Sequence, residues 1–346
     1  VFLMHLGFAG VESGLCRAKN CANILFKNTV PPAIGFLAFA ATGFSLMYPG
    51  ESNWIINNFL GFAGFGLHAP AGPDIAYNGN YTYWTDFFFQ GMFAATAATI
   101  VSGTVAERVK INAYMIFTVF YVGLVYPFLG SWAWGGGWLA DLNFHDFAGG
   151  TFVHCIGGWG ALAGVLLLGP RIGKFVNGHA MPIMGHSMPL ATAGVFCLWL
   201  GWFGFNGGSV LSADPSKVSL VLITTMLGAC AGTVAAMITS MVVLKKADLS
   251  MTLNGCLAGL VAITAGADCI TPTEAIFIGA VGGMLVVFSV LFFDKILIDD
   301  PVGALSVHLV NGIWGTLAVG IFGDGFSFTS QLIGVVAVGL VSFPAA

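Results

Sequence analysis

The sequence carries very little charge. Aspartate, glutamate, lysine and arginine make up 8% of its 346 residues, whereas hydrophobic residues make up 57% and the mean hydropathy is +0.90. A water-soluble protein cannot cover its surface with so few charged side chains. The composition therefore excludes a soluble globular protein and indicates a chain whose main solvent is lipid. We expect no nucleic-acid partner.

Paired-cysteine motifs are also missing. The seven cysteines are odd in number, none forms C-x-x-C, and nearly all lie in apolar segments. They are better explained as small buried hydrophobes than as a disulfide or metal framework. We expect no metal site, no cofactor and no enzymatic activity. An initiator methionine and a cleavable signal peptide are absent as well, and the last apolar stretch stops at Ala346, so we expect both ends to be trimmed.

Long charge-free runs take the place of the missing charge. They cover residues 28–50, 87–106, 111–140, 147–170, 218–244, 275–293 and 301–323. Each can cross a hydrocarbon core of about 30 Å, which needs roughly 20 helical residues. The runs are continuous rather than alternating, which argues against a transmembrane barrel. We predict an all-α polytopic membrane protein.

The charged and turn-forming residues between the runs predict eleven transmembrane helices. The expected spans are about 1–15, 27–48, 84–106, 112–131, 146–168, 190–206, 218–244, 250–266, 275–293, 302–323 and one beginning near 330. A long polar and aromatic connection fills 49–83. Pro31-Pro32 lies near the start of the second span and could kink that helix, but the sequence assigns it no role.

Basic residues predict the orientation of these spans. If the first loop is cytoplasmic and the loops alternate, ten of the eleven lysines and arginines fall on the cytoplasmic side, and only Lys217 falls outside. This is the positive-inside pattern. It predicts a multi-pass protein of the cell (inner or plasma) membrane, with its N-terminus outside and its C-terminus in the cytoplasm.

Two stretches echo each other at an offset of 154 residues. DFAGGTFVHCIGGWG (146–160) aligns with DPVGALSVHLVNGIWG (300–315), so that Asp146 meets Asp300 and His154 meets His308. Five spans separate them, so the two helices run in opposite directions. This predicts an inverted repeat of spans 1–5 and 6–10 followed by span 11, with the functional site between the repeats. The expected pseudo-symmetric halves, within a single membrane domain 1–346, are about 1–168 and 190–323.

The two histidines are expected to meet near the middle of the membrane. Each lies eight residues past an aspartate, or about 12 Å down a helix. They could be polar contacts that hold helices together, or a hydrogen-bonded pair that lines a conduit and relays protons. A third metal ligand is missing, since Cys155 points elsewhere on the helix. Asp146 and Asp300 are expected to cap their helices, with cation coordination as the minority interpretation.

Aromatic residues suggest a mouth for a cation. Phe93, Trp134 and Phe205 each lie toward the outer end of a span, and Trp134 with the Ser209 hydroxyl could bind a small cation through cation–π attraction. The chain has 31 phenylalanines, however, so the pattern alone does not distinguish Phe93 or Phe205 from lipid-facing or core residues.

Motifs along the whole chain carry a family resemblance. They are HLGFAGVESGLCRAKN, TVAERVK, WGGG, DFAGGTFVH, LGPRIGKF, GWFGFNGGS and DDPVGALSVH. With them the chain resembles the Amt/Mep ammonium transporter family and its Rh relatives. The resemblance implies homotrimers with one pore per subunit, an external ammonium site and a stacked phenyl gate. By motif, the site matches Trp134, Ser209 and Phe93 with Asp146 as its supporting carboxylate, the gate matches Phe93 and Phe205, and the twin histidines match His154 and His308.

Three functions remain open on the sequence. The leading hypothesis is electrogenic or facilitated transport of ammonium, with methylammonium as an analogue. The second is an ammonium receptor that signals through a fused domain beyond residue 346 or through a cytoplasmic regulatory protein. The third, a channel for neutral gas or water, would not need a cation-binding mouth.

Overall fold

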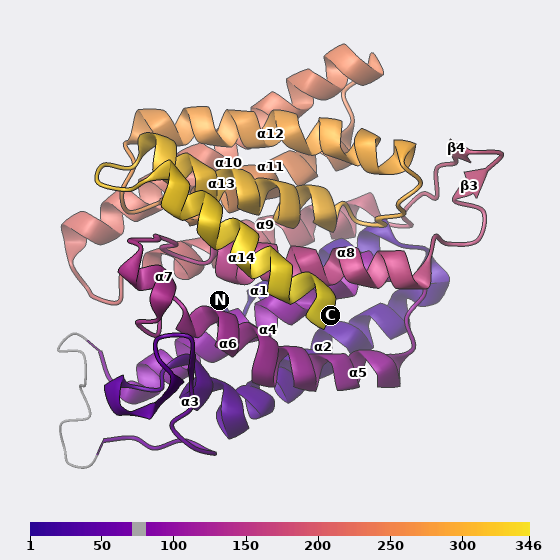
Figure 1. Cartoon of the computed structure of the whole chain (residues 1–346). Helices are drawn as coiled ribbons and strands as arrows, with labels where there is room; N and C mark the ends of the chain where they lie inside the picture. Colours follow the sequence, from indigo (N-terminus) through magenta and orange to yellow (C-terminus); the bar gives the residue numbers. More distant parts are fainter. Residues whose placement is uncertain (71–80) are drawn as a thin grey trace.

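The computed structural model describes residues 1–70 and 81–346, and it is a bundle of roughly aligned helices (Figure 1). The short helices α3 (Phe44–Met47) and α7 (Trp138–Asp141) lie at one end of the bundle, and the hairpin of β3 (Phe175–Val176) and β4 (His179–Ala180) projects from the other. We call these the Trp134 end and the Arg171 end. Residues 71–80, within the expected 49–83 connection, lie outside the described residues.

The elements up to residue 168 build one side of the bundle. In addition to α3 and α7 they are α1 (Met4–Leu15), η1 (Ala18–Asn20), α2 (Cys21–Ala38), η2 (Phe39–Gly43), η3 (Glu51–Asn53), β1 (Trp54–Ile56), β2 (Leu60–Gly61), α4 (Tyr83–Thr104), α5 (Ile111–Phe120), η4 (Tyr121–Val125), α6 (Tyr126–Ser131), η5 (Gly150–Cys155) and α8 (Ile156–Leu168). The strands β1 and β2 pair as a small antiparallel hairpin.

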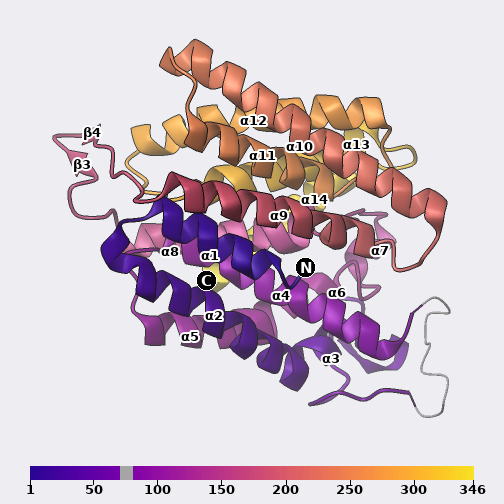
Figure 2. The same ribbon diagram turned by 180° about the vertical axis from the view of Figure 1, so that it is seen from behind.

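The second part of the chain, after β3 and β4, is almost entirely helical. It comprises α9 (Met188–Gly208), α10 (Pro215–Leu244), α11 (Leu249–Thr264), α12 (Pro272–Lys295), η6 (Leu305–Val310), α13 (Asn311–Phe322) and α14 (Phe328–Ala345). Viewed from behind, α1 lies along α9, and α10, α11 and α12 pack together beside them (Figure 2).

Each expected span coincides with a helix or a continuous helical run. Within the described residues, nine of these runs are long and apolar enough to cross a membrane, while the helices at the first and eighth expected spans, α1 and α11, have 12 and 16 residues. The second run begins earlier than expected, near Ala18, and α2 continues through Pro31 and Pro32. Its α-helical pattern changes only at the π-helical turn η2.

Glycine allows the helices to approach closely. A Cβ atom added to Gly279 of α12 would lie 2.3 Å from the carbonyl oxygen of Gly228 on α10, and one added to Gly194 of α9 would lie 2.5 Å from the backbone nitrogen of Val11 on α1. Side chains cannot fit there. Since lipid supplies no hydrophobic force between helices, such backbone contact provides the van der Waals packing that holds membrane helices together.

A buried ion network closes the Arg171 end. Arg171 forms hydrogen bonds from its Nε and Nη2 to the Asp299 carboxylate at 2.9 and 3.0 Å, and Arg108 lies 3.6 Å from the same carboxylate. Arg17 pairs with Glu107, which also lies 3.5 Å from Arg171. Burial alone would raise the pKa of Asp299, but hydrogen bonds from Arg171 and the charges of both arginines hold that pKa below its ordinary value.

Candidate functional site

The Trp134 end opens into a small cavity that contains the predicted cation site. The cavity measures about 140 Å³ and is lined by Trp134, Phe93 and Ser209 together with Tyr48, Tyr81, Phe89, Gln90, Phe147 and Leu211. The Trp134 indole nitrogen donates to the carbonyl oxygen of Asp146 at 2.7 Å, and the Ser209 hydroxyl donates to the carbonyl oxygen of Phe205 at 2.8 Å. The three predicted residues therefore share one cavity, and the hydrogen bond to Asp146 fixes the orientation of the indole.

Two phenyl rings close the floor of this cavity. Phe93 of α4 and Phe205 of α9 stack with their centroids 4.0 Å apart and their planes within 8°, and both are buried. The Phe93 ring lies 6.2 Å from the Trp134 ring. These are the two residues that the family motif suggested as a gate.

The two histidines contact each other directly below the phenyl pair. The Nδ1 atoms of His154 and His308 are 3.1 Å apart, the ring planes differ by 15°, and both side chains are buried. One Nδ1 must donate and the other accept, so at least one ring is neutral. The centroid of the His154 ring lies 5.6 Å from that of Phe205 and 5.2 Å from that of Trp202, on which the imidazole is stacked.

The arrangement forms a continuous series of rings along the bundle. It runs from Trp134 to Phe93, Phe205, His154, His308 and Phe8, with successive centroids 6.2, 4.0, 5.6, 5.1 and 6.1 Å apart. Six residues from six separate segments of the chain thus line up in one path. Such a path is apolar along its walls, with imidazole nitrogens as polar atoms at its centre.

Asp146 holds the first histidine helix in place. Its carboxylate accepts hydrogen bonds from the backbone N–H groups of Gly149, Gly150, Thr151 and Phe152, at 2.7 to 3.0 Å. The helix starts at Gly150, so the aspartate caps it from four residues upstream rather than from the N-cap position itself, which Gly149 occupies with φ of 97°. All four hydrogen bonds to the carboxylate are donated by backbone N–H groups of the helix end. The carboxylate therefore caps the helix rather than facing the cavity.

Asp300 repeats this arrangement at the other end of the bundle. Its carboxylate accepts from the backbone N–H groups of Gly303 and Leu305, at 3.1 and 2.7 Å. Gly303 has a left-handed φ of 82°, as its counterpart Gly149 does. Both histidines then lie in a π-helical turn, η5 and η6. π-Helical turns are rare and occur frequently at functional sites.

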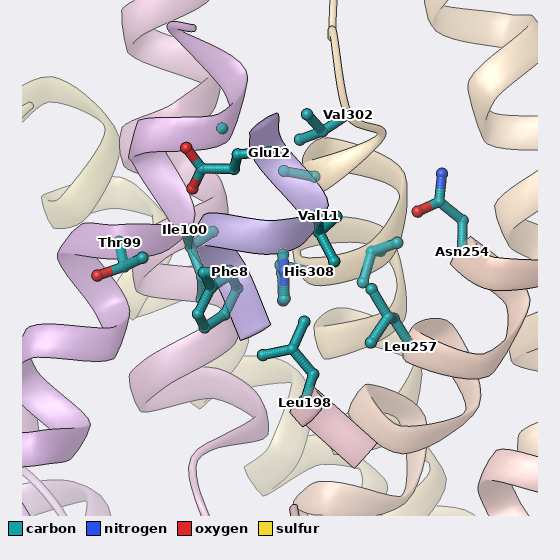
Figure 3. Close-up of a pocket in the computed structure, with 13 residues that line it drawn as sticks. Phe8, Val11, Glu12, Thr99, Ile100, Leu198, Asn254, Leu257, Val302 and His308 are labelled. Atoms are coloured by element: carbon teal, nitrogen blue, oxygen red, sulfur yellow. The ribbon is translucent and has the colours of Figure 1, made fainter. Parts of the chain in front are cut away.

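A second cavity lies beside His308 on the Arg171 side. It offers about 20 Å³ of space for the centre of a water molecule, enough for roughly one water. Phe8, Leu198 and Leu257 give it an apolar wall next to His308, and Glu12 and Asn254 lie at its edge (Figure 3). The Glu12 carboxylate accepts hydrogen bonds from Asn28 and Ser102.

Several of these residues were not identified from the sequence. Trp202 lies three residues before Phe205, on the same face of one helix, and this spacing could have revealed it. Phe8, Leu198 and Leu257 are apolar residues in apolar helices, so no pattern distinguishes them. His154 and His308 have no third metal ligand among the described residues, where only His145, Asp268 and Cys269 bring three candidate ligand atoms within 4.8 Å.

Comparison with known proteins identifies the family. A family model described as Ammonium Transporter Family matches residues 1–342. Ammonium transporter Amt2 of Archaeoglobus fulgidus is 43% identical over 336 residues, covering 94% of this chain and 69% of that protein. A solved structure described as Sensor Amt Protein superposes with a TM-score of 0.89 at 39% identity, covering 99% of this chain and 86% of that one.

A second solved structure belongs to the same group. Mep2 of Candida albicans superposes with a TM-score of 0.88 at 28% identity, covering 99% of this chain and 79% of that one. The sequence match extends over nearly the whole chain, and the apolar helices provide the spans that such a protein needs. The chain is therefore a multi-pass membrane protein that belongs to the ammonium transporter family.

Proposed function

We propose that this chain conducts ammonium across a membrane along the path from Trp134 to Phe8. The observation that carries the proposal is the series of buried rings with two touching imidazoles at its centre. Its membership of the ammonium transporter family supports the choice of substrate. Trp134, Phe93 and Ser209 recruit the ion, Phe93 and Phe205 form the gate, and His154 and His308 form the polar centre.

Recruitment of ammonium rests on the aromatic faces of the first cavity. A cation next to the Trp134 ring gains about 1–2 kcal/mol when partly desolvated. The Phe93 ring provides a second aromatic surface, and the Ser209 oxygen is an acceptor for an ammonium N–H. Asp146 acts through Trp134, because its carbonyl oxygen holds the indole in place.

Deprotonation follows from the cost of an unsolvated cation. The stacked phenyl rings exclude water, and a bare ion in an apolar path is very unfavourable. Ammonium therefore loses its proton as soon as it has passed the phenyl rings. It gives this proton to His154, whose ring lies next to Phe205, and neutral ammonia remains. Ammonia moves along the histidines and recombines with a proton on the Arg171 side, so that atoms and charge balance.

The histidine pair carries the released proton. A proton bound by His154 can pass to His308 across the 3.1 Å contact between their Nδ1 atoms. Each ring has a second nitrogen on which the proton arrives or leaves, and rotation of water or of the rings resets the pair. Ammonia and the proton thus cross separately, and the net process moves one positive charge.

The distribution of basic residues supports an orientation in the membrane, and the internal repeat supports a domain organisation. Arg17, Arg108 and Arg171 cluster at one end, which we assign to the cytoplasm, so the N-terminus is outside and the C-terminus inside the cell membrane. The chain forms one membrane domain, 1–346, with pseudo-symmetric halves of about 1–168 and 190–323. Matching aspartates, left-handed glycines and π-helical turns in η5 and η6 support the inverted repeat. The functional unit is a homotrimer in the bilayer.

A receptor is the second candidate. It is favoured by one observation, the 39% identity to the structure described as Sensor Amt Protein. A receptor would use the same Trp134 cavity to bind ammonium and would differ in its coupling to a cytoplasmic regulatory protein or to a domain beyond residue 346.

An ammonium pulse on proteoliposomes separates these possibilities. We expect a saturable current that appears with ammonium or methylammonium and is absent with sodium. Binding of ammonium to the purified protein without a current or a change in internal pH would favour the receptor. A change in internal pH without a current would indicate neutral ammonia conduction and would contradict only the proton relay.

A further inference from the structure

We propose that His145, Asp268 and Cys269 form a binding site for a divalent transition-metal ion of the Zn²⁺ class at the Trp134 end. The three residues are separated by up to 124 positions in the sequence, so they form no sequence motif with the short ligand spacing of a metal site. It lies beside the conduction path and contains none of the residues assigned to ammonium. The proposal therefore does not depend on the transport mechanism.

The three side chains bring their ligand atoms together. All three ligand atoms lie within 4.8 Å of one another, and the His145 Nε2 is 3.0 Å from the Asp268 Oδ1. In a tetrahedral zinc site with bonds of about 2.0–2.3 Å, the ligand atoms are about 3.3–3.7 Å apart. Small side-chain rotations are therefore enough to reach metal-binding distances, and no backbone movement is needed.

The backbone around His145 is held in place without a metal. Its N–H donates to the Gln331 side-chain oxygen at 2.9 Å, and its carbonyl oxygen accepts from the Gln331 side-chain nitrogen at 2.6 Å. Phe326 stacks on the imidazole with the centroids 4.3 Å apart. A ligand whose orientation is already fixed loses little entropy on binding, which favours affinity.

Backbone hydrogen bonds also join the two loops that carry the ligands. Phe147 N–H donates to the carbonyl oxygen of Ala265 at 2.9 Å, and Ala148 N–H donates to that of Thr264 at 3.2 Å. His145 is therefore tied to the end of α11, from which Asp268 and Cys269 follow directly. The loop geometry is set by the fold, and the metal would add a cross-link to it.

The kind of ligands selects the kind of metal. One imidazole, one thiolate and one carboxylate suit Zn²⁺ and neighbouring transition metals, whereas Mg²⁺ and Ca²⁺ require oxygen ligands. Three protein ligands leave one tetrahedral position for water. The His145 and Asp268 side chains are 23% and 30% exposed, so an ion can reach them. Asp268 also lines a cavity of about 270 Å³ that shares Phe147 with the Trp134 cavity.

The competing explanation for this cluster is that His145 and Asp268 form a hydrogen bond and that the Cys269 thiol lies nearby without binding a metal. Cobalt distinguishes the two, because Co²⁺ bound to a thiolate produces a charge-transfer absorption band. The experiment uses the full chain in detergent, purified with its thiols reduced and without a polyhistidine tag. Titration with Co²⁺ should give one such band per chain, and Zn²⁺ should displace it.

Substitutions then locate the site. Cys269→Ser should abolish the band, and His145→Gln and Asp268→Asn should weaken Co²⁺ binding roughly tenfold or more. The matched control is Cys21→Ser. Cys21 Sγ lies 3.5 Å from the Nε2 of His186, and this thiol–imidazole pair has no third metal-ligating side chain beside it among residues 1–70 and 81–346. This control should leave the band unchanged.

A second measurement needs no substitution. Zn²⁺ should protect Cys269 of the unmodified protein from alkylation, measured by mass spectrometry, by roughly tenfold relative to protein treated with a chelator. The proposal is overturned if no charge-transfer band forms, if the band survives Cys269→Ser, or if Zn²⁺ leaves the alkylation of Cys269 unchanged.

Discussion

The two histidine helices share one design but have different surroundings. Both begin with an aspartate, a left-handed glycine and a π-helical turn that contains the histidine. Asp146 satisfies four backbone N–H groups, whereas Asp300 accepts from two at hydrogen-bonding distance. The first helix therefore depends more heavily on its capping side chain than the second does.

The rings around the two histidines differ as well. His154 lies against Trp202 and Phe205, beneath the stacked phenyl pair. His308 lies against Phe8 and beside a cavity with room for roughly one water. The comparison separates two tasks that the repeat makes look alike. In the proposed path, the first helix lies beneath the section that Phe93 and Phe205 close to water, and the second lies where the path leaves that section.

Replacement of the capping aspartates should give the largest effect. Asp146→Ala leaves four backbone N–H groups without their partner, and each buried unpaired donor costs about 1–3 kcal/mol. We expect a loss of several kcal/mol for Asp146→Ala and roughly half of that for Asp300→Ala. Fluorescence-detected size-exclusion chromatography after heating measures the apparent unfolding temperature of each. An equal or reversed order would contradict the comparison.

The next largest effect concerns conduction through the histidine pair. His154→Ala or His308→Ala should leave a folded protein but reduce ammonium current roughly tenfold or more, since the remaining imidazole has no partner for proton transfer. The lost polar centre should also change selectivity and admit potassium. Currents from proteoliposomes test this, and normal selective conduction in both variants would end the relay. Unfolding of either variant would instead favour a structural role for the pair.

A smaller effect is expected at the mouth, which only the first helix possesses. Trp134→Leu should raise the ammonium concentration needed for half-maximal current by roughly 5- to 30-fold, the equivalent of about 1–2 kcal/mol of cation–π attraction. The matched control is Trp84→Leu, which alters a half-exposed tryptophan of α4 outside the cavity lining. An unchanged concentration dependence for Trp134→Leu would remove this residue from the mechanism.

The smallest effect concerns pH at the Arg171 end, where the second helix is anchored through Asp299. The pKa of Asp299 lies below its ordinary value of 3.8 in the folded protein. Its contribution to stability is therefore present above pH 3.8 and is lost as the pH falls through the lower, folded-state pKa. The difference in apparent unfolding temperature between the wild type and Asp299→Asn should shrink as the pH is lowered from 7 to about 3. A constant difference would show that the charge of Asp299 is not responsible.

The sequence predicted much of the fold because the membrane simplifies the problem. Apolar length predicts spans, and both the repeat and the family motifs led to His154 and His308. The π-helical turns η2, η4, η5 and η6 were not predicted, because a continuous apolar run has no period that separates an i→i+5 turn from an α-helix. The continuation of α2 through Pro31 and Pro32 was likewise not predicted, because proline disfavours a helix interior.

Long-range contacts account for what the sequence could not supply. Asp299 and Arg171 are 128 positions apart, and His145 and Asp268 are 123 apart, so neither pair leaves a local signal. The depth of the histidines was estimated with α-helical geometry from the aspartates, but the helix of His154 starts only at Gly150. Sequence patterns therefore predicted that the two histidines lie together better than they predicted the local geometry of their helices.

The stacked phenyl pair has a consequence for the rate of transport. The centroids of Phe93 and Phe205 are 4.0 Å apart, which leaves no aperture between the rings, so in the proposed path nothing passes while both rings are at rest. Passage must wait for a moment when one ring swings aside, and buried aromatic side chains move far less often than exposed ones. Throughput should then follow the frequency of that motion, and it should rise steeply on warming even when the mouth is saturated with substrate.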